Sequence, residues 1–291
     1  MERPAPLFTP VLIVGCFIML LSFAVRASFG VFQLPIAAEF GWARTEFSLA
    51  IAIQNLAWGI GQPLFGALAE KIGDRRAIVI GGFTYALGLV LSSYSTTPFA
   101  IQSLEVLVGF GVAGTGCGVI LAVVGRASTD DNRSMSLAIA TAAGSAGQVV
   151  GAPTAEFLLS MMPWQSVFLL FAAVILASLL ALPLMRAPAV TRIELEESMG
   201  DVLKRAVRDP SYAMIFMGFF SCGYQLGFLT AHFPALITEM SGPIAPGGIL
   251  YSLGITTTSA LGAVAIGLIG LANIGGTLAA GWAGKRYSKK Y

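Results

Sequence analysis

The chain has 291 residues, of which 56% are hydrophobic and only 11% are charged. Soluble domains carry about 25% charged residues, so a water-soluble fold could not hide this much apolar surface. The composition therefore predicts a polytopic membrane protein. The net charge of +2 is small, and no basic stripe with interleaved aromatic residues indicates binding to nucleic acid.

Eight apolar stretches follow one another along the chain, each long enough to cross a bilayer. An α-helix needs about 20 residues to span the hydrocarbon core. The predicted spans are 10–38, 46–69, 77–95, 98–125, 134–160, 164–186, 211–239 and 250–283. The predicted fold class is therefore an all-α integral membrane protein with eight transmembrane helices.

The basic residues segregate by side. When the gaps between spans are numbered alternately, all but two of the 17 Lys and Arg residues fall on one side of the predicted bilayer. The exceptions are Arg44, on the other side, and Arg26, inside the first span. Because short loops rich in Lys and Arg stay in the cytoplasm, we expect both termini to be cytoplasmic in a multi-pass protein of the cell (inner) membrane.

The longest gap predicts how the chain is organised. We expect an N-terminal six-helix bundle in residues 1–186, a cytoplasmic connector in residues 187–210, and the first two helices of a second, incomplete bundle in residues 211–291. The connector holds a run of mixed charges at residues 192–197. This composition is typical of a polar, partly helical link between two bundles.

Features that precede the connector recur after it. The pair Gly61-x4-Gly66, which stands before a basic loop, recurs as Gly276-x4-Gly281 before another basic loop. A helical unit that starts again after a central loop is typical of transporters built from parallel halves.

Several segments of the chain resemble a known protein family. Residues 66–76, Gly-Ala-Leu-Ala-Glu-Lys-Ile-Gly-Asp-Arg-Arg, resemble the signature loop of the major facilitator superfamily between its helices 2 and 3. Segments 29–32, 39–44 and 230–234 resemble its bacterial monocarboxylate and oxalate–formate branch. The resemblance implies a twelve-helix carrier of which this chain is the first two-thirds. It also implies transport of a small carboxylate by alternating access, as a symporter or an antiporter, with a proton as a candidate coupled ion.

The resemblance further implies a conformational-switch role for the signature loop, whose residues are Gly66, Glu70, Gly73, Asp74, Arg75 and Arg76. Its charged side chains are expected to form an ionic cluster at the cytoplasmic ends of the helices. Gly61 and Gly66 are expected to let helices approach closely. Simple anchoring by positive charge is the alternative interpretation.

Arg26 is a charged residue near the middle of the first span. Insertion scales put an Arg at mid-membrane at about 2.5–3.5 kcal/mol unfavourable, so it must face a wet cavity or bind an anion. A guanidinium suits a carboxylate because the two form parallel charge-assisted hydrogen bonds. A structural ion pair without a substrate role is the alternative.

Glu105 is the expected partner of Arg26. It stands about seven residues into the fourth span, and the rise of a helix puts it at a depth that permits contact or a water bridge. We expect Glu105 to pair with Arg26 in the empty carrier and to yield to a substrate carboxylate. The superfamily often has Arg at this position, so Glu is a departure from its pattern.

The seventh span supplies three more candidate binding residues, Tyr224, Gln225 and His232. The spacing of seven puts Gln225 and His232 on one helix face. His232 could bind substrate or relay a proton, or could equally be a packing residue. The polar residues Gln54 and Asn55 in the second span are more often packing residues than ligands.

The sequence predicts no cofactor and no metal site. Residues 109–114 spell G-x-G-x-x-G, but a dinucleotide fingerprint needs a preceding strand, and these glycines lie inside an apolar span and are expected to serve helix packing. The three cysteines have no C-x-x-C spacing, and there is one His. With no nucleophile–base pair either, an enzyme is not expected.

A competing interpretation gives the chain no transport of its own. It would be a truncated or split carrier fragment that acts only within a larger assembly, as an oligomer or with the missing C-terminal helices. The expected partners are then other helices and the lipid bilayer, beside the small organic anion that a transporter would carry.

Overall fold

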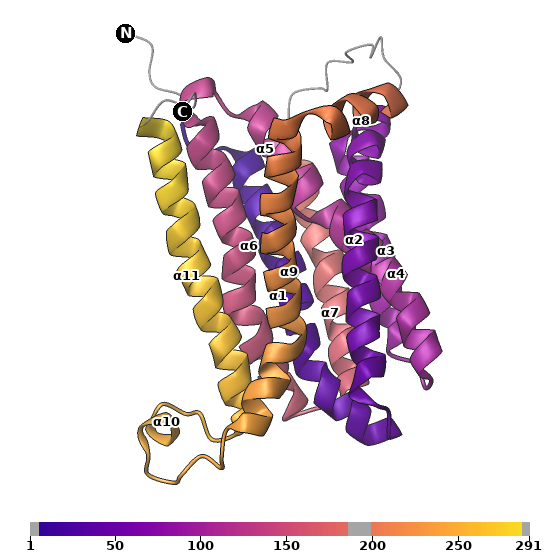
Figure 1. Ribbon diagram of the computed structural model, residues 1–291, viewed down its shortest axis with the longest axis vertical. Coiled ribbons are helices and arrows are strands. Elements are labelled where there is room, and N and C mark those ends of the chain that lie inside the picture. The colour runs from indigo at the N-terminus through magenta and orange to yellow at the C-terminus, as the bar shows by residue number, and fades with distance from the viewer. Residues whose placement is uncertain (1–5, 186–198, 287–291) are drawn as a thin grey trace.

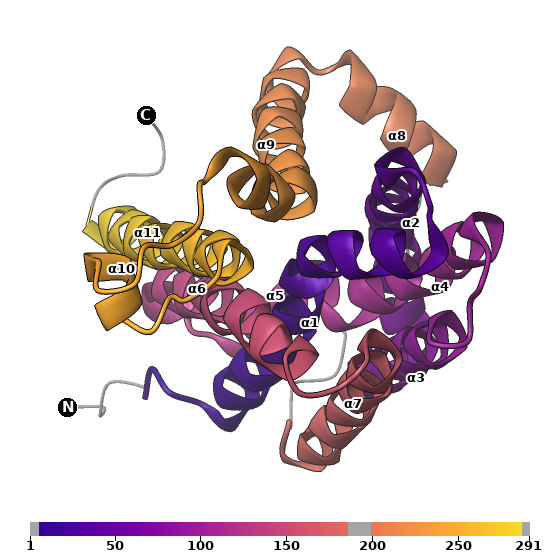
Figure 2. The ribbon, with the colours of Figure 1, turned by 90° about the horizontal axis from the view of Figure 1, so that it is seen from below.

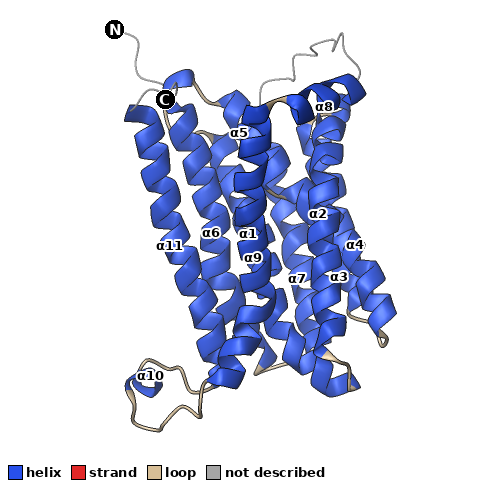
Figure 3. Ribbon diagram, viewed as in Figure 1, coloured by secondary structure: helices blue, strands red, loops and turns tan. Residues whose placement is uncertain are grey.

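The computed structural model describes residues 6–185 and 199–286, and this part of the chain is helical without a strand (Figure 3). Its long helices run side by side between two ends of the molecule (Figure 1). The elements are α1 Pro10–Phe40, α2 Arg44–Ile72, α3 Asp74–Ser92, α4 Pro98–Thr115, α5 Cys117–Ala127, α6 Asp130–Leu159, α7 Trp164–Ser178, the 3-10 helix η1 Leu179–Leu184, α8 Met199–Arg208, α9 Pro210–Met240, α10 Ile249–Ser252 and α11 Thr258–Arg286. The prediction of an all-α membrane fold is confirmed.

Seven helical stretches in the described residues are long and apolar enough to cross a membrane. They are α1, α3, α4 with α5, α6, α7 with η1, α9 and α11. The eighth predicted span, α2, is 29 residues long but is not among them. It carries polar side chains such as Gln54, Asn55 and Gln62 along its length. The count of eight transmembrane helices therefore stays a prediction.

Two predicted spans differ from the observed helices. The span predicted at 98–125 is interrupted at Gly116, whose extended backbone separates α4 from α5. The span predicted to start at residue 250 starts at Thr258 instead, because residues 249–252 form the separate short helix α10. Gly254 has a positive φ of 81°, which ends that short helix by turning the chain into a conformation that glycine readily adopts.

Three of the long helices begin at the same local signal. Thr9, Thr97 and Asp209 each stand before a proline at the first helical position and accept a hydrogen bond from a backbone N–H of the first turn. Proline fits this position because its missing N–H would have no helical partner, and the cap satisfies one of the free donors. The starts of α1, α4 and α9 are therefore encoded within a few residues.

Glycines set how closely the helices approach. A Cβ at Gly109 would collide with the backbone of α2, one at Gly111 with Tyr85 of α3, and one at Gly114 with Gly81. The G-x-G-x-x-G run thus serves helix packing, as predicted. Gly147 and Gly151 of α6 meet the backbone of α1 in the same way. Small residues allow these contacts, which supply much of helix association in a membrane.

The helices that follow α8 pack unequally. α11 lies against α6, where Gly270 meets the backbone of Ser145 and Gly281 meets Ala138. α9 contacts α1 where Gly30 meets the carbonyl of Thr230. Along its first half, residues 211–225, α9 is exposed at every position. Seen along the helices, this half stands apart from α2, α3 and α4 (Figure 2).

Apart from Arg26, within α1, and Arg44, the described basic residues gather at the end of the molecule where α1 begins and α11 ends (Figure 1). They include Lys71 at the end of α2, Arg126 at the end of α5 and Arg133 at the start of α6. Arg44, at the start of α2, lies at the other end. Arg3, Arg186, Arg192, Lys289 and Lys290 and the mixed-charge run 192–197 lie outside the described residues. Which end faces the cytoplasm, and the division into two bundles, stay predictions.

Candidate functional site

Arg26 lies inside the helix packing rather than facing lipid. Its side chain is 4% exposed, and Nη2 donates a hydrogen bond to Oδ1 of Asn55 on α2 at 2.7 Å. The guanidinium carbon lies 4.4 Å from the ring centroid of Trp58 and 6.0 Å from that of Phe23. Nη1 is buried and has no hydrogen-bond partner within the described residues.

Asn55 is held in place for this contact by its own helix. Its Nδ2 donates to the carbonyl of Ile51, one turn earlier, at 2.9 Å. With the amide nitrogen fixed there, the amide oxygen is the atom presented to Arg26. The orientation of the guanidinium is thus determined by α2, and only one of its two terminal nitrogens is used.

Glu105 lies equally deep on α4 and is 1% exposed. Its Oε2 accepts a hydrogen bond from Nε2 of Gln54 at 2.8 Å. Its Oε1 is buried and lacks a partner in the part of the chain that the structure describes. A buried carboxyl oxygen left unpaired is costly, so this group can accept a further donor or a proton.

The predicted direct pairing of Arg26 with Glu105 is not formed among the described residues. Each binds instead a different amide of α2, and these amides, Asn55 and Gln54, are neighbours in sequence. Successive residues point about 100° apart around a helix. Asn55 of α2 therefore faces Arg26 of α1, and Gln54 faces Glu105 of α4. Gly109 permits this because it lets α4 meet the α2 backbone at Gln54. The two charges are therefore linked through α2.

The three candidates on α9 lie apart from this network. Tyr224 is 68% exposed, Gln225 is exposed, and His232 is half-buried with its ring 5.3 Å from that of Phe228. None of them has a hydrogen bond or ion pair to Arg26 or Glu105 in the described chain. α1 and α9 start at the same end (Figure 1), and Gly30 packs on Thr230. A rise of about 1.5 Å per residue then puts Gln225 near the depth of Arg26.

Comparison with known proteins decides the family. The model of the Major Facilitator Superfamily matches residues 15–291. The chain belongs to the major facilitator superfamily. The solved structure of a bacterial homologue of the human lysosomal transporter Spinster, inward-facing and unoccupied, is similar with a TM-score of 0.56 and 15% identity, and the match covers 97% of this chain and 75% of that one. A D-xylose–proton symporter has a TM-score of 0.60 and 13% identity, with 96% and 69% covered. These two structures show the fold.

Curated proteins with similar sequences carry names of transporters and of a multidrug resistance protein. YcxA of Bacillus subtilis, an uncharacterized MFS-type transporter, is 26% identical over 243 residues, which are 79% of this chain and 59% of that protein. Monocarboxylate transporter 13 of Rattus norvegicus is 30% identical over 154 residues, or 53% and 36%. The multidrug resistance protein MdtH of Aeromonas hydrophila is 27% identical over 242 residues, or 79% and 57%. The chain spans less than two thirds of each relative.

The major facilitator signature loop is only partly ionic in this structure. Gly73, with φ 95°, joins α2 to α3 directly. Asp74 then pairs with Arg126 at the end of α5 at 2.6 Å, and Nε of Arg75 donates to the carbonyl of Met185 at 2.7 Å. The expected ionic cluster is not formed within the described residues, because Asp74 pairs with the end of α5 while Arg75 binds the carbonyl of Met185, just after η1. Glu70 and Arg76 are exposed without an ion pair there.

Gly61 and Gly66, the glycine pair of α2 that precedes this loop, also differ. A Cβ at Gly61 would meet Phe110 and Ala113 of α4, so this glycine makes the expected close contact. A Cβ at Gly66 would meet nothing within 4 Å in the described structure. The close approach expected at Gly66 is therefore not made by any described helix, although the neighbouring Phe65 lies against Gly114 near the end of α4.

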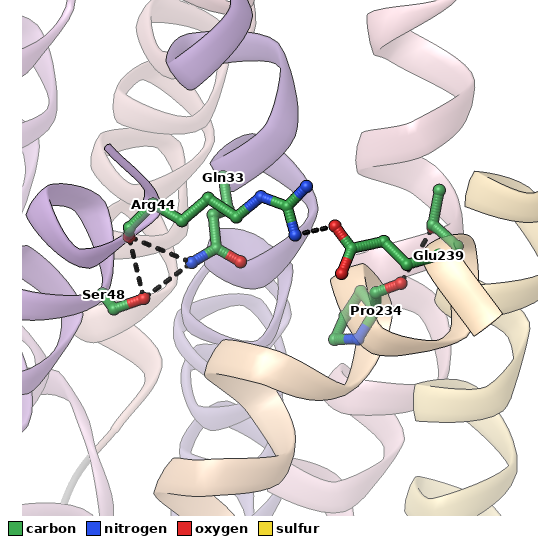
Figure 4. Close-up of polar contacts among 6 residues, drawn as sticks. Gln33, Arg44, Ser48, Pro234 and Glu239 are labelled. Atoms are coloured by element: carbon green, nitrogen blue, oxygen red, sulfur yellow. Dashed lines mark hydrogen bonds and ion pairs between the residues drawn. The ribbon is translucent and has the colours of Figure 1, made fainter. Parts of the chain in front are cut away.

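At the opposite end, polar contacts join the early helices of this major facilitator protein to α9 and α11. Arg44, at the start of α2, forms an ion pair with Glu239, near the end of α9 (Figure 4). Gln33 of α1 donates to Ser48 at 2.7 Å beside it. Ser259 of α11 donates to Glu156 of α6 at 2.7 Å. The ion pair of Arg44 with Glu239 and the hydrogen bond of Ser259 to Glu156 each connect segments more than 100 residues apart.

Proposed function

We propose that this chain is part of a secondary transporter of a small organic anion, a monocarboxylate or a related carboxylate, that works by alternating access in the cell membrane. Membership of the superfamily supports transport, and the likeness to monocarboxylate transporter 13 supports the substrate class. The observation that carries the proposal is the buried Nη1 of Arg26, which lacks a partner among the described residues.

The physical argument concerns the charge of Arg26. A guanidinium at mid-membrane is unfavourable unless it is paired. Asn55 is neutral, so its hydrogen bond orients the guanidinium without balancing its charge. Leaving a buried donor unpaired costs about 1–3 kcal/mol, more for a charged group. A carboxylate that binds at Nη1 removes both penalties, and this gives the site its preference for anions.

Glu105 fits the role of a proton site in the same transporter. One of its oxygens is fixed by Gln54, and the other is buried without a partner in the described chain. A proton on Glu105 would remove the uncompensated charge while leaving the bond to Gln54 intact. Because Gln54 and Asn55 are adjacent, a shift of α2 when the anion binds would be felt at Glu105. This supports coupling of anion and proton.

Uptake into proteoliposomes by the full-length protein tests the proposal. The probes are labelled formate, acetate, lactate and oxalate. We expect uptake of at least one of them by the wild type and none by Arg26→Ala, because the alanine removes the anion partner. Arg208→Ala, an exposed charge on α8, is the matched control and should transport normally. Absence of carboxylate uptake by the wild type would overturn the function.

The proton role has its own test. Wild-type uptake is expected to rise as the pH on the entry side falls, since protonation of Glu105 accompanies the anion. Glu105→Gln mimics the protonated form, so its uptake should lose that pH dependence. Unchanged pH dependence and affinity in Glu105→Gln would remove Glu105 from the coupling.

A second candidate function is favoured by the exposure of α9. Only 6% of the most apolar 18-residue segment of α9 is buried. The curated relatives of the chain are longer than the chain itself. The described residues could thus act only within a larger assembly, an oligomer or a complex with further helices. Native mass spectrometry in detergent gives the oligomeric state. A protein that is monomeric there and transports carboxylates in the uptake assay would exclude this second function.

A further inference from the structure

We propose that Trp58 is a substrate-binding residue, and that its indole N–H and Nη1 of Arg26 form one two-donor site for a carboxylate. The proposal rests on the proposed function and adds the residue that shares the substrate with Arg26. Trp58 has no mark in the sequence that would set it apart from a packing aromatic.

The first observation is that two buried donors without partners belong to side chains that lie against each other. Nε1 of Trp58 and Nη1 of Arg26 are both buried without a hydrogen-bond partner in the described chain. The ring of Trp58 lies against the guanidinium, 4.4 Å from centroid to carbon. A buried indole N–H usually finds a partner, and most buried polar atoms do. Two exceptions on stacked side chains point to one shared acceptor.

The second observation is that the neighbouring residues hold both donors in place. Asn55 binds Nη2 of Arg26 from the turn of α2 that precedes Trp58. The ring of Phe23 meets that of Trp58 edge-on, with centroids 5.8 Å apart. Gly109 lets α4 pack on the backbone nitrogen of Trp58. The pair is thus organised before any ligand arrives, which reduces the entropy lost on binding.

The chemistry of the two groups selects the ligand. An indole nitrogen and a guanidinium are donors only, so neither can satisfy the other. The ligand must supply two acceptor atoms near each other and a negative charge for Arg26. A carboxylate has two oxygens in this arrangement and accepts charge-assisted hydrogen bonds. Glu105 does not serve in the described chain, because its Oε2 accepts from Gln54 and its Oε1 bonds to neither donor.

The test compares two tryptophan variants of the full-length protein in proteoliposomes. Trp58→Phe keeps an aromatic ring beside Arg26 and removes the N–H. We expect the KM for the transported carboxylate to rise about tenfold or more, as for a lost hydrogen bond to a charged group, with kcat little changed. Trp42→Phe is the matched control, since Trp42 stacks on Phe40 outside this site, and its KM should equal that of the wild type.

A measurement on the wild type removes any dependence on the folding of the variant. The ultraviolet resonance Raman spectrum of tryptophan reports hydrogen bonding of the indole N–H. Adding the transported carboxylate should shift the indole N–H band, and adding its uncharged amide should not. A wild-type spectrum that the carboxylate leaves unchanged would overturn the role of Trp58, as would a KM of Trp58→Phe equal to that of the wild type.

The outcomes also distinguish failure of the Trp58 assignment from failure of the proposed anion-transport function. If the wild type transports a carboxylate, Arg26→Ala does not, and Trp58→Phe matches the wild type, only the assignment of Trp58 fails. If the wild type neither transports nor binds any of the carboxylates, the anion-carrier function fails and the assignment falls with it.

Discussion

The glycines of α4 and the glycines of α9 differ in their surroundings: those of α4 lie against other helices, and three of those in α9 do not, within the described chain. Gly109, Gly111 and Gly114 of α4 each lie where a Cβ would collide with a neighbouring helix. Gly218, Gly223 and Gly227 of α9 have nothing within 4 Å of a Cβ in the described structure. Glycines in membrane helices commonly mark faces built for close approach. The comparison shows that composition predicts such a face, while only packing shows whether a partner fills it.

The largest expected effect breaks a filled contact. Gly151 of α6 faces the backbone of Ala24 on α1, so Gly151→Leu must push the two helices apart. We expect a loss of about 3 kcal/mol in the free energy of unfolding, in line with overpacking of a core, measured by thermal unfolding in detergent. Gly223→Leu, on the uncontacted face of α9, should cost nothing. Equal effects of the two would contradict the comparison.

The next prediction sharpens the contrast between the buried polar network and the exposed candidates of α9. Asn55→Ala removes the partner of Nη2 of Arg26 and leaves a second buried donor of that guanidinium unpaired. The expected loss is about 2 kcal/mol of unfolding free energy. Gln225→Ala on α9 serves as the control and is expected to change stability by less than about 0.5 kcal/mol. A stable Asn55→Ala protein would mean that Arg26 has another partner.

A smaller effect is expected in the signature loop. Asp74→Asn weakens the ion pair to Arg126 and removes a negative charge from the first turn of α3, where the helix dipole favours it. We expect about 1 kcal/mol of destabilisation in the same unfolding assay. Glu70→Gln, an exposed carboxylate of the same loop, should have no measurable effect. A larger effect at Glu70 than at Asp74 would mean that the loop is organised around Glu70.

The smallest effect is expected for the contact between Arg44 and Glu239. Both side chains are about half exposed, and exposed ion pairs contribute about 0.2–1 kcal/mol. A double-mutant cycle with Arg44→Gln and Glu239→Gln should give a coupling energy in this range. The coupling should shrink as salt is added, because salt screens exposed charges. A coupling energy that is independent of salt would show that the pair is shielded from water.

The fold was largely predictable because apolar length and basic loops are properties of the sequence alone. The interruption at Gly116 was not predicted, since one more glycine in a glycine-rich apolar stretch carries no separate signal. The start of the last helix was predicted too early because residues 249–252 are themselves apolar and helical. The composition of α2 also shows that a helix can pack among transmembrane helices while carrying several polar residues.

The candidate site was predictable at the level of single residues and less so at the level of contacts. A charge in an apolar span is visible in the sequence, so Arg26 and Glu105 could be selected. Their partners depend on how α2 is rotated, which packing at Gly109 decides. The prediction therefore placed Arg26 on Glu105, where the structure has Asn55 and Gln54 between them, and it passed over Trp58. The substrate roles of Tyr224, Gln225 and His232 stay predictions.

The capped starts of α1, α4 and α9 have a consequence for how the protein is made. Each start is specified by a capping side chain and the proline after it, so it needs no contact from a distant part of the chain. A growing chain can therefore fix where each of these helices enters the bilayer while the ribosome is still synthesising the helices that later pack against it. Errors in biogenesis should then concentrate at helices without such a start, α2 among them.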